Sequence, residues 1–311
     1  MEMGLSPLVG CAYSPSHITG FFSIHDEPRN PLLRGSTGAG VSLEKGVVTS
    51  VYAQPSEKTH IEYVFNNQMF PLGEACIVKT VLDHYLGVAG EKYKILVEQQ
   101  AAVPIGHGFG VSGGVALSLS LALNQALETG YTREEAAQIA HIAEIKCLTG
   151  LGTVLAEYYG GFELRTRPGA PGYGEVEQLS FPLDHVVVCV TTGPIKTKNI
   201  LNTPTTKRRV NNIYANVVEE FVEDKSLGSF LKLSRRFADA TGFETVEVQR
   251  LLKVFDRIDM PASMLMFGGG VFTIAHRKRL VEILKAVKTL ETMRGWEIVV
   301  SRIAGRGACN L

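Results

Sequence analysis

The sequence has no excess of either charge and no long apolar run, and each absence excludes a class of protein. Its 31 lysines and arginines equal its 31 aspartates and glutamates, so no overall field favours a nucleic acid or an acidic membrane surface. No segment reaches the roughly 18 consecutive apolar residues of a membrane-spanning helix, and the start of the chain lacks the basic region of a secretion signal. We therefore expect a cytoplasmic protein with neither nucleic-acid nor membrane partners.

Paired cysteines are also missing. The five cysteines are odd in number and scattered, and none forms a CxxC pair. This pattern favours neither a disulfide framework nor a zinc site, and we expect each cysteine to be a small buried residue. They are Cys11, Cys76, Cys147, Cys189 and Cys309.

Glycine is abundant, with 32 residues gathered mainly in clusters, and a chain of 311 residues exceeds the usual size of one core. Apolar periodicity predicts an α+β fold. A glycine- and proline-rich stretch at 167–174 precedes a change towards charged amphipathic helices, so we expect domains at 1–180 and 181–311. The expected strands lie in the first fifty residues and at 93–98, 160–169, 184–191 and 296–302, with a pair of strands at 263–275. The expected helices lie at 74–86, 115–129, 132–147, 210–240, 244–256 and 278–293.

The most informative cluster is the segment 104–114, which follows a predicted strand and precedes a buried helix. Glycines let a loop take positive φ and bring its N–H groups close to a phosphate, and the helix start adds a partial positive charge. A P-loop is disfavoured because the lysine of GxxxxGK[ST] is absent. A Rossmann fold expects an acid at the end of a second strand, whereas Glu134 and Glu135 fall inside a predicted helix. A tight glycine turn that only packs a helix on a sheet remains the plain alternative.

Several motifs together carry a family resemblance. PxxxGFGVSGG at 104–114 resembles the phosphate loop of the GHMP kinases. The chain is similar to the archaeal pantoate kinases of that superfamily in SPSHITGFF at 14–22, RGSTGAG at 34–40, TGLG at 149–152, GPI at 193–195 and SML at 263–265 with Val271 and Phe272. The resemblance implies a ribosomal protein S5 domain 2-like N-terminal domain and a ferredoxin-like C-terminal domain. It also implies ATP and Mg²⁺, pantoate as the substrate that is phosphorylated toward coenzyme A, and a homodimer.

The resemblance assigns the nucleotide and the metal to specific residues. Ser112 matches a Mg²⁺-binding serine, its alternative being an ordinary helix N-cap. Glu144 matches an acidic Mg²⁺ ligand, its alternative being a solvated glutamate on a helix face. The expected nucleotide-binding residues are Pro104, Gly106, His107, Gly108, Phe109, Gly110, Val111, Ser112, Gly113 and Gly114.

Thr153 departs from the family pattern, in which an aspartate often follows the Gly-Leu-Gly turn as general base. A loose phosphoryl-transfer transition state needs little proton removal, so transfer can survive this loss. His17 is an alternative base because an unperturbed histidine titrates at about 6.5, and it could equally hydrogen-bond a substrate hydroxyl or be structural. We list Thr153 and His17 with Ser112 and Glu144 as candidate catalytic residues.

Pantoate carries a carboxylate, for which a guanidinium is the natural bidentate partner. Arg34 is the first choice and Arg165 the weaker one, since a strand arginine often only reaches to solvent. Thr19, Ser36 and Thr37 offer hydroxyls in the same region, although such residues in turns often serve the backbone. The resemblance implies that the glycines at 268–270 are a third motif, whose backbone lies close to the nucleotide and to the loop at 104–114, and a glycine turn between two strands is the plain alternative.

Other functions remain open from the sequence. A homoserine- or mevalonate-type kinase would share the fold. So would an ATP-dependent mevalonate diphosphate decarboxylase, which the missing acid at Thr153 disfavours. A catalytically silent binding protein is disfavoured by the presence of Ser112, Glu144 and a full glycine loop.

Overall fold

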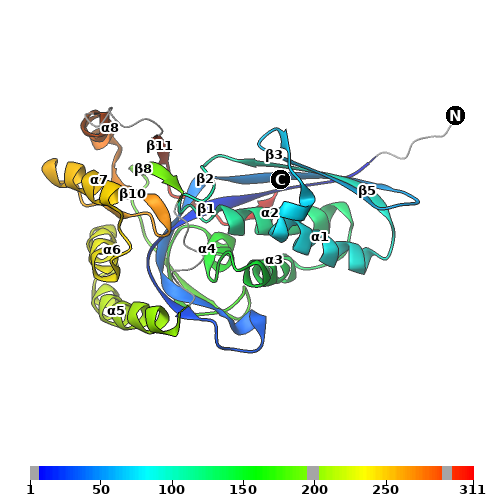
Figure 1. The fold of residues 1–311 in the computed structure, drawn as a ribbon, viewed down its shortest axis with the longest axis horizontal. Coiled ribbons are helices and arrows are strands. Elements are labelled where there is room, and N and C mark those ends of the chain that lie inside the picture. The colour runs from blue at the N-terminus through cyan, green and yellow to red at the C-terminus, as the bar shows by residue number, and fades with distance from the viewer. Residues whose placement is uncertain (1–6, 195–202, 289–295) are drawn as a thin grey trace.

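The computed structural model describes residues 7–194, 203–288 and 296–311, and its elements form two sheets with helices packed against them (Figure 1). The α+β class predicted from the sequence is confirmed. None of the helices within the described ranges is long and apolar enough to cross a membrane.

The first sheet is built on a hairpin of two unusually long strands. Its order is β12-β1-β2-β5-β3-β4, and β6 pairs with both β2 and β7. The bounds are β1 Leu8–His25, β2 Gly35–Pro55, β3 His60–Phe65, β4 Gln68–Met69, β5 Tyr93–Ala101, β6 Phe162–Arg167, β7 Glu175–Leu179 and β12 Cys309–Asn310. The sequence predicted several short strands in the first fifty residues, which is wrong because register shifts after Pro15 and Thr19 bend β1 without ending it.

Four helices lie together on one side of this sheet (Figure 1). They are α1 Cys76–Ala89, α2 Val111–Ala126, α3 Arg133–Cys147 and α4 Thr153–Tyr159. Helix α2 is buried on nearly all sides, as its continuous apolar sequence predicted. Thr132 and Glu135 form the predicted capping box of α3. Helix α1 runs past Gly87, where the sequence predicted its end, and stops at the left-handed Gly90.

Cys76 and Cys147 form a disulfide, which corrects the expectation that no cysteine is bridged. The first is the first residue of α1 and the second is the last residue of α3, with Cα atoms 6.0 Å apart. The two helices pack on each other, so residues 71 positions apart in the chain meet. Cysteine spacing alone carries no sign of this contact. No cluster of residues suited to a metal such as zinc occurs in the described part of the chain.

The second sheet has the order β11-β8-β10-β9 with antiparallel neighbours. Numbered along the chain this order is 4-1-3-2, with helices after the first and third strands, which is the ferredoxin-like arrangement. Its elements are β8 His185–Pro194, α5 Pro204–Glu223, α6 Leu227–Thr241, α7 Val246–Arg257, β9 Ser263–Met264, β10 Gly268–His276, α8 Leu280–Lys288 and β11 Glu297–Ser301. Three short 3-10 helices complete the described chain, at Pro31–Leu33, Leu72–Glu74 and Arg277–Arg279.

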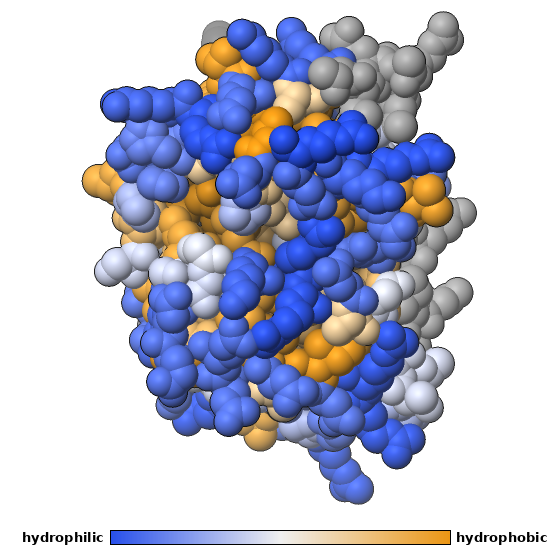
Figure 2. Space-filling view, turned by 90° about the vertical axis from the view of Figure 1, so that its left-hand side faces the viewer, coloured by the Kyte–Doolittle hydropathy of each residue, from blue (hydrophilic) through white to orange (hydrophobic). Residues whose placement is uncertain are grey.

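Helices α5 and α6 also contact β1, so the two sheets share one core. Phe21 of β1 packs edge-on against Phe221 of α5, and Asn211 makes two side-chain bonds to the backbone of Ile24. The outer face of α5, α6 and α7, on the side away from the sheets, carries mostly hydrophilic side chains (Figure 2). The charged amphipathic pattern of these helices predicted this. Strand β7 of the first sheet ends at Leu179 and β8 of the second sheet begins at His185, but β12 near the end of the chain returns to pair with β1.

Candidate active site

The glycine loop between β5 and α2 has the backbone of a phosphate-binding turn. Gly106, Gly108 and Gly110 have φ of 77°, 86° and 67°, values that disfavour any residue with a Cβ. Gly110 directly precedes α2, and no side chain caps that helix. The first N–H groups of α2 therefore remain available to an anion.

The glycines at 268–270 lie against this loop, as expected. A Cβ at Gly268 would stand 2.0 Å from the carbonyl oxygen of His107, and one at Gly108 would stand 2.8 Å from that of Met266. His107 itself bonds through Nδ1 to Thr191 Oγ1 at 2.7 Å, and burial lowers its pKa. The loop is thus held between β8, the β9–β10 turn and α2, which fixes its shape before any ligand binds.

Ser112 and Glu144 meet directly beside the loop. Ser112 Oγ donates to Glu144 Oε1 at 2.9 Å, so the alternative of Ser112 as an N-cap is wrong. Glu144 is fully buried, which overturns the alternative of a solvated glutamate, and burial raises its pKa to about 7. Its Oε2 has no hydrogen-bond partner among the described residues. A hydroxyl and a carboxylate with a spare oxygen fit Mg²⁺, which prefers hard oxygen ligands.

Thr153 begins α4 and packs its methyl group against the loop. A Cβ at Gly110 or Gly113 would stand 2.7 or 2.8 Å from Thr153 Cγ2. Glu157 lies one helical turn later on the same face and is fully buried, with Oε1 unpartnered within the described chain. Burial, and then the charge of Glu144, raise its pKa well above the ordinary value. Sequence reasoning missed Glu157, although its i+4 position relative to Thr153 could have indicated it.

His17, Glu163 and Arg165 form a buried cluster across β1 and β6. Glu163 Oε1 is 3.0 Å from His17 Nε2 and also accepts a bond from a terminal nitrogen of Arg165. Arg165 is 1% exposed, so the expectation that it reaches to solvent is wrong. In the described structure Arg165 Nε and Glu163 Oε2 have no partner. Glu163 was not predicted, but its i+2 spacing from Arg165 on a strand places both on one face.

Two of the predicted substrate hydroxyls join this cluster. A Cβ at Gly152 would stand 2.0 Å from Ser36 Oγ and 3.4 Å from Arg165 Nε, so both polar atoms face the turn just before Thr153. Thr19 Oγ1 lies 3.4 Å from His17 Nδ1.

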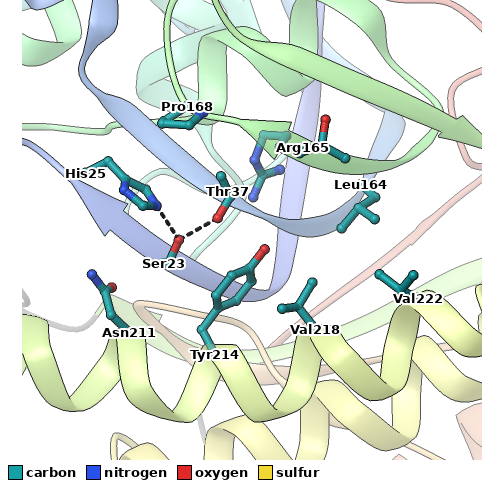
Figure 3. Close-up of a pocket in the computed structure, with 11 residues that line it drawn as sticks. Ser23, His25, Thr37, Leu164, Arg165, Pro168, Asn211, Tyr214, Val218 and Val222 are labelled. Atoms are coloured by element: carbon teal, nitrogen blue, oxygen red, sulfur yellow. Dashed lines mark hydrogen bonds between the residues drawn. The ribbon is translucent and has the colours of Figure 1, made fainter.

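Thr37 lines a cavity together with Arg165 of that group, whereas Arg34 bonds to the backbone of its own loop. Thr37 bonds to Ser23, and both line a cavity of about 480 Å³ between the hairpin and α5. Figure 3 shows Ser23, Thr37 and His25 facing Tyr214 and Asn211 across this cavity. Successive strand residues point to opposite faces, so Thr37 and Ser36 diverge. The Nε of Arg34 donates to the carbonyl of Pro28 at 2.6 Å.

Comparisons with known proteins agree with this geometry. Residues 75–161 match the model of the GHMP kinases N terminal domain. The chain is 36% identical over 293 residues to a pantoate kinase of Thermococcus kodakarensis, covering 91% of this chain and 92% of that protein. It is 31% identical over 277 residues to a pantoate kinase of Methanocaldococcus jannaschii, covering 89% and 96%.

Solved structures give the same result for the fold. A structure described as a phosphotransferase related to the CoA biosynthesis pathway matches with a TM-score of 0.85 and 31% identity over 97% of this chain and 98% of that one. Mevalonate diphosphate decarboxylase from Staphylococcus aureus matches with a TM-score of 0.74 at 15% identity over 98% of each chain, a likeness of fold alone. The chain therefore belongs to the pantoate kinase family of the GHMP kinases.

Proposed function

We propose that this protein transfers the γ-phosphoryl group of ATP to the hydroxyl of pantoate, giving 4-phosphopantoate. The observation that carries the proposal is that two incomplete polar groups, the Ser112–Glu144 pair and the buried guanidinium of Arg165, border one turn. A Cβ at Gly150 would stand 2.5 Å from Glu144 Oε1, and one at Gly152 would stand 3.4 Å from Arg165 Nε. A buried polar atom without a partner costs about 1–3 kcal/mol. Such atoms gathered at one place indicate that a polar ligand completes them.

The nucleotide phosphates lie in this proposal against the N–H groups of residues 106–114 and the start of α2. Ser112 Oγ and Glu144 Oε2 hold Mg²⁺, which supplies positive charge to the phosphates when bound. The contribution of the chain is to position these oxygens: Gly110 leaves the helix start open, and Glu144 is fixed by burial.

The acid end of the substrate binds at Arg165. Its Nε is unpaired among the described residues while a terminal nitrogen is held by Glu163, so one edge of the guanidinium is free for a carboxylate. Ser36 Oγ stands at the same turn and provides a hydroxyl. Arg34 supplies positive charge from the neighbouring loop but is already bonded to Pro28.

An ADP-release assay with a panel of hydroxy acids tests the proposal. Pantoate, homoserine, mevalonate and shikimate are each supplied with Mg-ATP, and carbon dioxide release from mevalonate diphosphate is followed in parallel. ADP formed only with pantoate supports the assignment. Turnover with another alcohol, release of carbon dioxide, or no ADP with any compound would refute it.

A further inference from the structure

Two fully buried carboxyl groups beside the glycine loop have no cation to balance them. They belong to Glu144 of α3 and Glu157 of α4. None of the ion pairs formed within residues 7–194, 203–288 and 296–311 involves either residue. In the same ranges Glu144 Oε2 and Glu157 Oε1 have no hydrogen-bond partner. Buried charges in proteins are paired or bind a metal, so these two groups, when ionised, need a positive partner.

The two carboxyl groups lie close enough for their charges to interact. Burial, and then the charge of Glu144, raise the pKa of Glu157 well above its ordinary value. Both groups also reach the start of α2. Ser112 Oγ donates to Glu144 Oε1 at 2.9 Å. A Cβ at the next residue, Gly113, would stand 2.8 Å from Glu157 Oε2. The serine and both carboxyl groups therefore border one helical turn.

Glycines line the space around these carboxyl groups. A Cβ at Gly150 would stand 2.5 Å from Glu144 Oε1. A Cβ at Gly110 would stand 3.0 Å from the unpartnered Oε1 of Glu157. Gly110 is also the residue that leaves the start of α2 without a side-chain cap, where the nucleotide phosphates are proposed to lie. Carboxylates and phosphates repel one another at such a short range unless a cation lies between them.

The other contacts of Glu157 do not explain why an acid is buried there. Ser14 Oγ donates to Oε2 at 3.5 Å, which is long for a hydrogen bond. The backbone carbonyl of Glu157 accepts from the N–H of Ala308 at 3.0 Å, a contact that any residue could make. Thr153, one turn earlier, turns its methyl group to the loop. An apolar side chain would fill this space without the cost of burying a carboxyl group.

We propose that Glu157 is a further ligand of the magnesium ion assigned to Ser112 and Glu144, an inference that rests on the proposed kinase function. Mg²⁺ is usually bound by one or two carboxylates together with substrate phosphates, and two carboxylates balance the charge of one divalent ion. The oxygens free to bind it are Glu144 Oε2 and Glu157 Oε1. The acid that is missing at Thr153 is then present one turn later, as a metal ligand instead of a base.

A metal titration tests the assignment without turnover. Mn²⁺, followed by the paramagnetic resonance signal of the free ion, is titrated at pH 8 into the whole protein with an equimolar non-hydrolysable ATP analogue. Glu157→Gln has nearly the same shape but no charge, and it should weaken Mn²⁺ binding about tenfold or more. Glu144→Gln should weaken binding at least as much. Glu244→Gln alters another glutamate with a buried side chain, far from the loop in sequence, and should bind Mn²⁺ like wild type.

A crystal structure of the wild type with Mn²⁺ and the same analogue locates the ion independently of any variant. Its anomalous signal should show oxygens of both Glu144 and Glu157 in the coordination sphere. Wild-type metal affinity in a Glu157→Gln variant that is folded by thermal melting overturns the inference. So does an ion on Ser112 and Glu144 with Glu157 outside its coordination sphere. Metal bound by both carboxylates without pantoate-dependent ADP refutes the proposed function instead, while the metal assignment still stands.

Discussion

Replacing Glu144 with glutamine should make the metal-free protein more stable, and only at higher pH. Burial raises the pKa of Glu144 from 4.5 to about 7. A carboxyl with a higher pKa in the folded chain binds its proton more tightly when folded, so the folded state loses stability as pH rises from 4.5 to about 7. At about 1.4 kcal/mol per unit of pKa, this shift costs on the order of 3 kcal/mol above pH 7.

Thermal melts at pH 5 and pH 8, with and without Mg²⁺, measure this effect. Without the metal, Glu144→Gln should melt a few degrees above wild type at pH 8, because the glutamine stays neutral, and nearly equal to it at pH 5. Bound Mg²⁺ compensates the carboxylate charge, so Mg²⁺ with an ATP analogue should stabilise wild type more than the variant. The charge of Glu144 is one cause of the raised pKa of Glu157, so its removal makes Glu157 easier to ionise and changes stability in the same direction. Equal melting differences at the two pH values would show that Glu144 is not held as described.

Three further changes test other parts of the site. Ser112→Ala should lower kcat about 100-fold or more with the melting temperature nearly unchanged, because it removes the proposed metal ligand and no cap. Steady-state ADP release measures this change, and wild-type turnover would end the metal assignment. Arg165→Lys should raise the KM for pantoate about tenfold or more, since hydrogen bonds to charged groups contribute about 1.5–3 kcal/mol. Arg34→Ala should raise this KM less. If Arg34→Ala has the larger effect, the substrate carboxylate binds at Arg34. Cys76→Ser should lower the free energy of unfolding by about 2–4 kcal/mol. Reductant should destabilise wild type by a similar amount and leave the variant unaffected. Chemical denaturation measures both effects, and equal free energies of unfolding for wild type and variant would contradict the disulfide.

The sequence predicted features that depend on local chemistry. The glycine loop, the buried helix behind it and the capping box at Thr132 follow from backbone freedom, apolar periodicity and side-chain capping, which act within a few residues. Ser112 and Glu144 were identified through the family pattern, and the structure brings them within hydrogen-bond distance.

The features that sequence reasoning missed depend on contacts between distant segments. The disulfide joins residues 71 positions apart, and Glu163 matters because β6 lies opposite β1 across β2. Arg165 was underrated because a strand arginine normally reaches water, whereas here Glu163 compensates its buried charge.

The central claim is that residues 106–114 hold a magnesium-bound nucleotide while Arg165 holds the acid substrate beside it. A crystal structure with Mg²⁺, a non-hydrolysable ATP analogue and pantoate tests this most directly. We expect phosphate oxygens against the loop N–H groups, the metal on Ser112 and Glu144, and the pantoate carboxylate on Arg165. A nucleotide bound elsewhere with this loop empty would contradict it.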